Sequence, residues 1–205
     1  MSVVVARQLI YFATGGSEGK EFFHSSIERL NEWLQAEFGV RFSVRELSTE
    51  LQDQVLHALQ TQISSSWGKS TEAARAVNYD EIFEPVLAVY CPHESQIKQN
   101  GIAGCPSGRW GVSDGATFAV IYESDNRQLI WHELLHTLSA QDCYTDDAGH
   151  SREPSCESNR PECLMRFDPS DFHCGASPSL CEHNRGRISR LADIIRSEAA
   201  SRGGD

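Results

Sequence analysis

The sequence predicts an α/β fold organised as a single domain. Segments rich in Val, Ile, Phe and Tyr alternate with segments in which apolar residues recur every three or four positions. The 205 residues suffice for one substantial core, and 40% hydrophobic with 23% charged residues is typical of a folded globular protein. We therefore expect one sheet covered by helices.

The chain opens with a strand followed by a helix. Residues 3–12 are rich in β-branched and aromatic side chains, which predicts a strand. Gly15 and Gly16 separate this strand from a helix whose apolar stripe runs over residues 22–38, and Gly39 stands where that helix should end.

The same alternation continues through the middle of the chain. Residues 40–47 alternate apolar and polar side chains, as a half-buried strand does, and residues 48–63 have the spacing of an amphipathic helix. Two short apolar strands are expected at residues 85–90 and 116–122, on either side of a glycine-rich region at residues 101–115.

A further helix is expected before a long loop. Ser124 or Asp125 would cap this helix, which continues to about Ser139. Residues 142–171 are crowded with Asp, Gly, Pro, Ser and Cys, so an ordered loop there must be held by something other than a core. Apolar periodicity over residues 185–199 predicts a C-terminal amphipathic helix.

Charge and hydropathy exclude two classes of partner. The formal net charge of −11 argues against a surface that neutralises nucleic-acid phosphates. No stretch approaches the ~20 apolar residues that span a bilayer. Arg7 and Gln8 interrupt the apolar N-terminus, which therefore resembles a strand more than a signal peptide. We expect a cytoplasmic protein, although a trimmed secretory precursor would leave the same trace.

One helical motif carries chemistry. His132 and His136 are four residues apart, so on a helix both imidazoles face the same way and can bind one ion. Zinc suits such nitrogen ligands. Glu133, beside the first histidine, is placed to take a proton from a water on that ion. The motif therefore predicts zinc-dependent hydrolysis of an amide.

The residues after this motif resemble those of the metzincin zinc peptidases. The pattern His132-Glu-x-x-His136-x-x-Ser139-x-x-Asp142 matches the metzincin signature, with Asp142 at the position of the third ligand and Ser139 where the family has glycine. An aspartate third ligand resembles the snapalysin-like branch. Because the family glycine permits a positive φ, serine at position 139 implies strain in the turn that leads to Asp142.

Two further features of the C-terminal part extend the resemblance. Met165 is the candidate for the methionine turn that metzincins place beneath the metal. Cys163-x-Met165, and Cys143 directly after the third-ligand position, are similar to archaemetzincins. Tyr144 resembles a tyrosine that snapalysin-like enzymes use to stabilise the tetrahedral intermediate. Glu157 and, less favourably, His150 are alternative metal ligands.

Seven cysteines leave two interpretations open. The archaemetzincin resemblance implies a second, structural zinc, and its ligands would be Cys143, Cys163, Cys174 and Cys181. The odd number of cysteines favours zinc over complete disulfide pairing. A snapalysin-like relative would instead imply disulfides. These would join Cys156 or Cys163 to Cys174 or Cys181, and pair Cys91 with Cys105.

The resemblance implies a single metallopeptidase domain over residues 1–205, with a mixed twisted sheet and the active-site helix in residues 1–139. Residues 140–205 would form a smaller subdomain with the methionine turn. The expected substrate is a peptide or protein, paired as an added strand along an edge segment at residues 110–113. Endopeptidase and aminopeptidase activity both remain open. The alternatives are a non-catalytic, zinc-stabilised protein-interaction module and a metal-free α/β binding domain.

Overall fold

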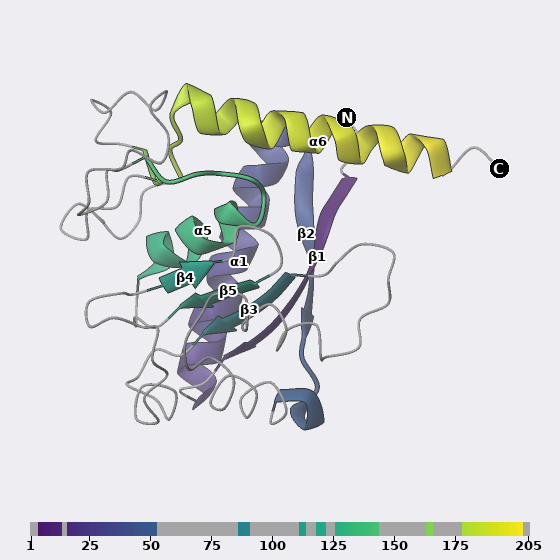
Figure 1. Cartoon of the computed structure of the whole chain (residues 1–205). Coiled ribbons are helices and arrows are strands. Elements are labelled where there is room, and N and C mark those ends of the chain that lie inside the picture. Colours follow the sequence, from purple (N-terminus) through teal and green to yellow (C-terminus); the bar gives the residue numbers. More distant parts are fainter. Residues whose placement is uncertain are drawn as a thin grey trace, which may run out of the picture.

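The computed structural model describes residues 4–13, 16–52, 86–90, 111–113, 118–121, 126–143, 163–165 and 178–202. Within these ranges a five-stranded sheet packs against helices, and one long helix lies across an end of the sheet (Figure 1). The predicted α/β class is therefore confirmed. The division of the chain at residue 139 into two subdomains stays a prediction.

Four strands of the sheet are parallel and one edge strand is antiparallel. The strands are β1 (Val4–Ala13), β2 (Val40–Glu46), β3 (Val86–Tyr90), β4 (Gly111–Ser113) and β5 (Phe118–Ile121). Their order is β2-β1-β3-β5-β4, with β4 antiparallel to β5. The strands predicted from composition are confirmed. The predicted edge segment corresponds to β4, although Trp110 lies outside the described residues.

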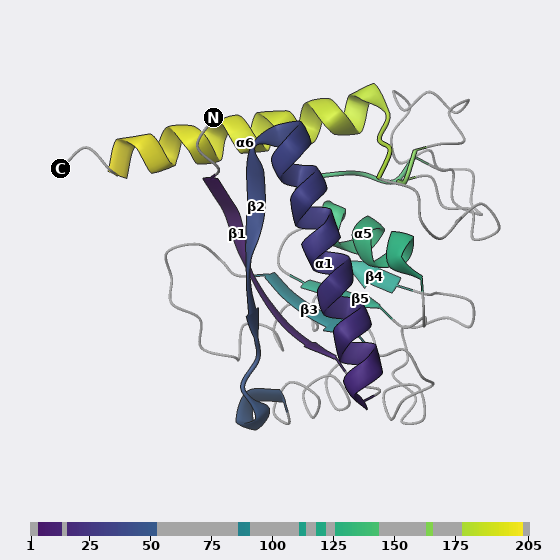
Figure 2. The ribbon, with the colours of Figure 1, turned by 180° about the vertical axis from the view of Figure 1, so that it is seen from behind.

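Helix α1 (Gly16–Phe38) makes the crossover between the parallel strands β1 and β2 and covers one face of the sheet (Figure 2). Its stripe of buried residues, with Phe23, Ile27, Leu30 and Leu34 fully buried, forms much of the core. Gly39 ends the helix with a φ of 69°, as predicted, and its N–H donates to the Gln35 carbonyl.

Helix α5 (Arg127–His136) begins one residue later and ends earlier than predicted. Neither Ser124 nor Asp125 caps it; the N-cap is Asn126, whose side-chain oxygen accepts from the Leu129 N–H at 3.1 Å. The helix ends at His136 rather than near Ser139, because Ser139 takes a left-handed conformation that no helix can continue.

Helix α5 is docked on α1 by a buried hydrogen bond. The indole Nε1–H of Trp131 donates to the Ser26 carbonyl of α1 at 2.7 Å. Around this bond α5 buries its leucine and isoleucine side chains: Leu129, Ile130, Leu134 and Leu135 are fully buried. The helix that carries the two histidines is therefore part of the core, so their positions are fixed by the packing of the whole sheet.

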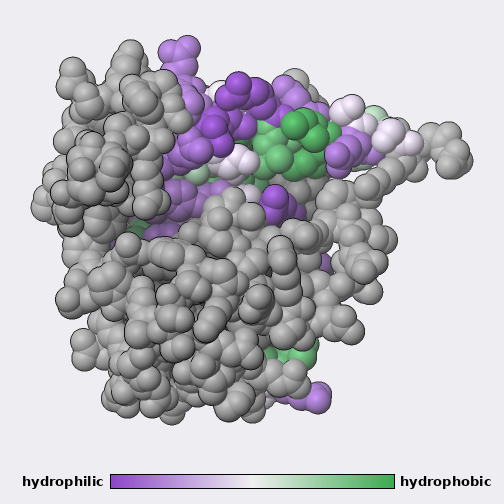
Figure 3. Space-filling view, viewed as in Figure 1, coloured by the Kyte–Doolittle hydropathy of each residue, from purple (hydrophilic) through white to green (hydrophobic). Residues whose placement is uncertain are grey.

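Helix α6 (Glu182–Arg202) crosses the end of the sheet at which β1 and β2 begin (Figures 1 and 2). It confirms the predicted helix at residues 185–199 and extends it at both ends. Ile188, Ala192 and Ile195 face the core, whereas the visible side of α6 is mainly hydrophilic around one apolar patch (Figure 3). No helix in the described ranges is long and apolar enough to cross a membrane.

Part of the predicted secondary structure falls outside the described residues. The helix expected at residues 48–63 is seen only as the helical residues Thr49–Gln52. Most of the predicted loop at residues 142–171 is likewise outside, apart from residues 142–143 and 163–165.

The outer edge of the sheet at β2 is held by a side chain of α1. The amide of Asn31 accepts from the Phe42 N–H at 2.8 Å and donates to the Phe42 carbonyl at 3.0 Å. Since β2 pairs only with β1 among the described strands, Asn31 satisfies two main-chain groups that face away from β1.

We predict that Asn31→Ala lowers the free energy of unfolding by about 1–3 kcal/mol, because the two main-chain groups of Phe42 lose their partner. Chemical denaturation would measure the change. The exposed neighbour Glu32→Ala is the control and should change stability by less than about 0.5 kcal/mol. Equal stability of the two variants would contradict the role given to Asn31.

Candidate metal centre

Three donor atoms converge at the end of α5. The Nε2 atoms of His132 and His136 are 3.1 Å apart. Asp142 Oδ1 lies 3.3 Å from the first and 3.2 Å from the second. All three residues are mostly buried. The structure therefore brings together the three residues that the sequence predicts as ligands of one metal ion.

A turn at Ser139 carries the chain from α5 to Asp142. Ser139 has a φ of 73°. Its N–H donates to the His136 carbonyl, and the Ala140 N–H donates to the Leu135 carbonyl. These bonds form a Schellman motif with serine in the left-handed position that glycine usually occupies. The strain predicted for Ser139 is thus present, at a cost of about 1–3 kcal/mol.

Both histidines are oriented by main-chain carbonyl groups. Nδ1 of His132 is 2.9 Å from the Leu164 oxygen, and Nδ1 of His136 is 3.0 Å from the Ala140 oxygen. A carbonyl oxygen only accepts hydrogen bonds, so each Nδ1 carries the hydrogen. In a neutral imidazole this leaves the Nε2 lone pair directed toward the other ligands. Such hydrogen bonds orient metal-binding histidines in proteins generally.

The spacing of the three donor atoms fits zinc. Asp142 Oδ1 is buried and, as long as neither Nε2 atom carries a proton, has no hydrogen-bond donor among the described residues. With both Nδ1 atoms protonated, three lone pairs meet within 3.1–3.3 Å, which is unfavourable without a cation. Ligands about 2.0–2.1 Å from a tetrahedral zinc ion are about 3.3 Å from one another. The three side chains are therefore already at the separation that zinc requires.

The charges at the site also favour a cation. Burial lowers the pKa of His132, but its hydrogen bond to Asp142 and the nearby carboxylates outweigh burial and raise the pKa to about 9. Burial raises the pKa of Asp142, but the two histidines outweigh it and hold that pKa well below its usual range. Without a metal ion, one proton would therefore be held between His132 and Asp142. A single proton cannot bridge all three donor atoms, so it relieves the repulsion between their lone pairs less completely than a metal ion would.

The site also contains a buried carboxylate, Glu133, and has one side that is open to solvent. Glu133 is buried beside His132, and its charge contributes to the raised pKa of that histidine. The side chains of His136 and Asp142 remain 14% and 11% exposed, whereas His132 is nearly inaccessible. Solvent therefore reaches the ligand set from the side of His136 and Asp142. Three ligands with an accessible fourth position are typical of catalytic rather than structural zinc.

The segment Cys163–Met165 passes against the metal ligands. Leu164 supplies the carbonyl that orients His132, and the Met165 carbonyl accepts from the N–H of Cys143, the residue after Asp142, at 2.8 Å. Met165 is fully buried. The predicted methionine therefore lies in a segment that contacts the site, while its role as a methionine turn stays a prediction.

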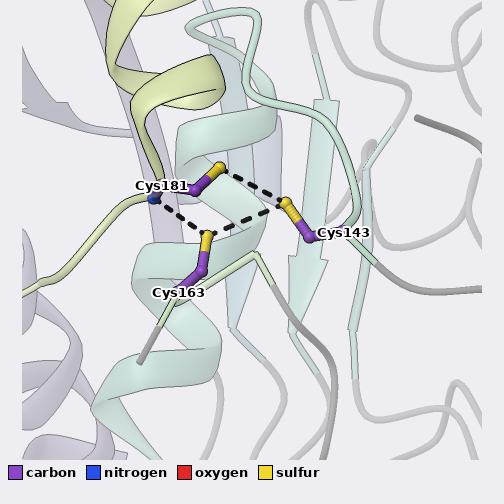
Figure 4. A group of neighbouring side chains, drawn as sticks. All are labelled: Cys143, Cys163 and Cys181. Carbon is purple, nitrogen blue, oxygen red and sulfur yellow. Dashed lines mark hydrogen bonds between the residues drawn. The ribbon is translucent and has the colours of Figure 1, made fainter. Parts of the chain in front are cut away.

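Cys163 of this segment belongs to a cluster of three sulfur atoms, together with Cys143 and Cys181 (Figure 4). Cys143 Sγ is 3.7 Å from Cys163 Sγ and 3.6 Å from Cys181 Sγ. The Cys181 N–H donates to Cys163 Sγ at 3.3 Å, and Asn184 Nδ2 donates to Cys143 Sγ at 3.1 Å. Thiolates about 2.3 Å from a tetrahedral zinc ion are about 3.8 Å apart. These three sulfurs could therefore bind a metal ion as a group.

The bonding of these sulfurs is mixed. Cys163 and Cys181 are free, whereas Cys143 is disulfide-bonded, so its partner is neither of these two. Burial raises the pKa of the Cys163 thiol, and the backbone hydrogen bonds of Cys181 and Met165 oppose this only in part. A bound cation would favour the thiolate form of Cys163. The spacing of the three sulfurs agrees with the predicted zinc site, and the bonded state of Cys143 agrees with the predicted disulfide alternative.

Several predicted site residues lie outside the described part of the chain. They are Tyr144, the fourth sulfur ligand Cys174, the alternative ligands His150 and Glu157, and the alternative disulfide cysteines Cys91, Cys105 and Cys156. Three contributors to the site were not predicted from sequence: the carbonyls of Ala140 and Leu164, and the side chain of Asn184. Main-chain carbonyls leave no trace in a sequence, and a lone asparagine on a helix gives no distinctive signal.

No family model and no curated protein matches the sequence. Among solved structures, the chain is similar to an archaemetzincin from Methanopyrus kandleri. The two share 14% sequence identity with a TM-score of 0.49, over 92% of this chain and 97% of that chain. At this level of similarity the comparison carries no argument about activity, which must be inferred from the site itself.

Proposed function

We propose that the chain is a zinc-dependent peptidase, with His132, His136 and Asp142 as the zinc ligands. The observation that carries this proposal is the convergence of two Nε2 lone pairs and a carboxylate oxygen within 3.1–3.3 Å of one another. Imidazole nitrogen with a carboxylate suits zinc, whereas magnesium and calcium prefer sites made of oxygen. Two of the three ligands are also partly exposed, so solvent can reach them.

Glu133 is the catalytic base of the proposed reaction. Zinc at this site would polarise the substrate carbonyl and lower the pKa of a water molecule. The carboxylate of Glu133 would accept a proton from the attacking water and deliver it to the nitrogen of the departing amine. Its burial beside His132 supports this role, because burial places the carboxylate close to the ligands rather than in bulk solvent.

A peptide substrate would lie along the free edge of β4. Among the described strands this one is the last in the sheet order and pairs only with β5, and it packs against α5. An extended peptide could therefore add to the sheet as a further strand beside the helix that carries His132 and His136. The main-chain groups of such a peptide would be held by hydrogen bonds that do not depend on its sequence.

The sulfur cluster is proposed as a second, structural zinc site of the reduced protein, in which Cys143 is a free thiolate rather than part of a disulfide. Cys143, Cys163 and Cys181 would be three of its ligands, and Cys174 is the proposed fourth. The S–S separations of 3.6 and 3.7 Å support a metal ion. The site would hold the chain next to Asp142 and next to the carbonyl that orients His132, because Cys143 follows Asp142 and Cys163 precedes Leu164.

We predict that Glu133→Gln lowers kcat for peptide hydrolysis by about 10²–10⁴-fold while zinc remains bound, because the neutral amide cannot accept the proton. Activity assays and metal analysis of the purified variant would measure both. The exposed Glu182→Gln, on α6, is the control and should retain full activity. Normal hydrolysis by the Glu133 variant would refute this mechanism.

We predict that the chain, purified under reducing conditions, binds one zinc ion for each of the two donor groups. His136→Ala should remove one zinc ion and abolish activity, and Cys163→Ser should remove the other. Mass-spectrometric metal analysis gives the stoichiometry. If His136→Ala retains all the zinc, the catalytic site is refuted.

The sulfur site has an independent test. Thiol titration of the unfolded, chelated protein without reductant should find all seven cysteines reactive if they bind zinc or are free. Protected sulfurs that become reactive only after reduction would favour the disulfide interpretation of the cluster.

We predict that proline at alternate positions of Gly111–Ser113 raises the KM for long peptides about 2–10-fold, by removing an outward N–H that would pair with substrate. Short peptides that do not reach β4 serve as the control, and their KM should not change. A KM for long peptides that is unchanged from wild type in every one of these proline variants would refute binding along this edge.

A further inference from the structure

We propose that Asn184 and Arg187 of α6 are positioning residues that hold the turn delivering Asp142 to the metal. This inference rests on the proposed zinc site, in which Asp142 is the third ligand. Neither side chain contacts a ligand atom of the site. Each binds the main chain on the N-terminal side of Asp142, so together they fix the path along which the carboxylate reaches the two histidines.

Asn184 holds the main chain at Gln141. Its Oδ1 accepts from the Gln141 N–H at 2.8 Å, and its Nδ2 donates to the Gln141 carbonyl at 2.9 Å. The same Nδ2 lies 3.1 Å from Cys143 Sγ. Asn184 is fully buried, so these contacts are shielded from water. One side chain thus binds the residue before Asp142 and the residue after it.

Arg187 holds the strained residue of the same turn. Its Nε donates to the Ser139 carbonyl at 2.6 Å. Ser139 has a φ of 73°, a conformation that serine leaves readily unless the surrounding structure imposes it. Asn184 and Arg187 are three residues apart, so both project from one side of α6. The helix therefore fixes the turn at two points, Ser139 and Gln141.

The helix also offers a matched comparison for Arg187. Arg196, further along α6, donates from Nη1 to the Phe38 carbonyl at 2.7 Å. Arg187 and Arg196 thus make the same kind of bond, from a guanidinium to a main-chain oxygen, and both attach α6 to the rest of the chain. Only the bond of Arg187 ends on the turn before Asp142. A purely structural role would make the two arginines equivalent.

The decisive experiment compares zinc affinity in Arg187→Ala and Arg196→Ala by competition with a chromophoric chelator. The zinc counted is the zinc that wild type binds and His136→Ala does not. This difference excludes the zinc bound by the sulfur cluster. Arg187→Ala should raise the Kd for this zinc about 10–100-fold, as loss of a residue that orients metal ligands typically does. Arg196→Ala should leave it within about 2-fold, although both variants lower the Tm of the metal-free protein.

A rescue experiment tests the link to Ser139. Glycine adopts a positive φ without strain, so Ser139→Gly should restore most of the zinc affinity that Arg187→Ala loses. The same replacement in the wild-type background should change affinity little, since Arg187 already holds the turn. Asn184→Asp keeps the size of the side chain but cannot donate to the Gln141 carbonyl, and it should weaken zinc binding in the same direction as Arg187→Ala.

The outcomes separate this inference from the proposed function. If wild type and His136→Ala bind equal zinc, there is no zinc at His136, and both proposals are overturned. If that zinc is present but Arg187→Ala and Arg196→Ala bind it equally, only the positioning role is overturned. Failure of Ser139→Gly to restore affinity would also overturn it, because the bond of Arg187 would then serve some purpose other than holding the strained turn.

Discussion

The hydrogen bond from each histidine Nδ1 to a main-chain carbonyl is the constraint on which the site depends. These two bonds leave both Nε2 lone pairs pointing toward Asp142, and they require the Ala140 and Leu164 carbonyls to lie within hydrogen-bonding distance of the two imidazoles. Ala140 follows the helix directly, but Leu164 is 32 residues from His132. The chain must therefore return to α5 after a long excursion, and the remaining contacts of the C-terminal part hold it there.

Two sets of contacts hold that returning segment. Its main chain pairs with Cys143 through the Met165 carbonyl and with Ser179 through the Leu164 N–H. Its side chain at Cys163 joins the sulfur cluster, in which Cys181 leads directly into α6. Cys163 belongs to the sulfur cluster, and the next residue, Leu164, contacts the candidate metal ligand His132. One short segment therefore connects the two donor groups. Whatever bonds the sulfurs make also determines where the Leu164 carbonyl lies and how His132 is oriented.

The parts of this structure that can be predicted from the sequence are those with a regular spacing of residues along the chain. Apolar periodicity identified α1, α6 and the strands, because burial of one face imposes a regular spacing on the chain. The interval between His132 and His136 identified the ligand pair for the same reason. The N-cap was misplaced because Ser124, Asp125 and Asn126 are all good caps, and tertiary packing selects among them. Asn184 and Arg187 were missed because contacts spanning 43 and 48 residues have no period.

The asparagine at position 31 and the one at position 184 share a feature with consequences for how the sequence can vary. Asn31 binds the N–H and the carbonyl of Phe42, and Asn184 binds those of Gln141. These bonds are to main-chain atoms and do not involve the side chain of the bound residue. The Gln141 side-chain oxygen is buried without a hydrogen-bond partner in the described ranges, so the site draws nothing from it. Position 141 is therefore constrained through its main chain, and proline, which has no N–H to donate to Asn184, is excluded there. We therefore expect the side chain of Asn184 to be more strongly constrained than the side chain of Gln141, although Gln141 is the one adjacent to Asp142 in the sequence.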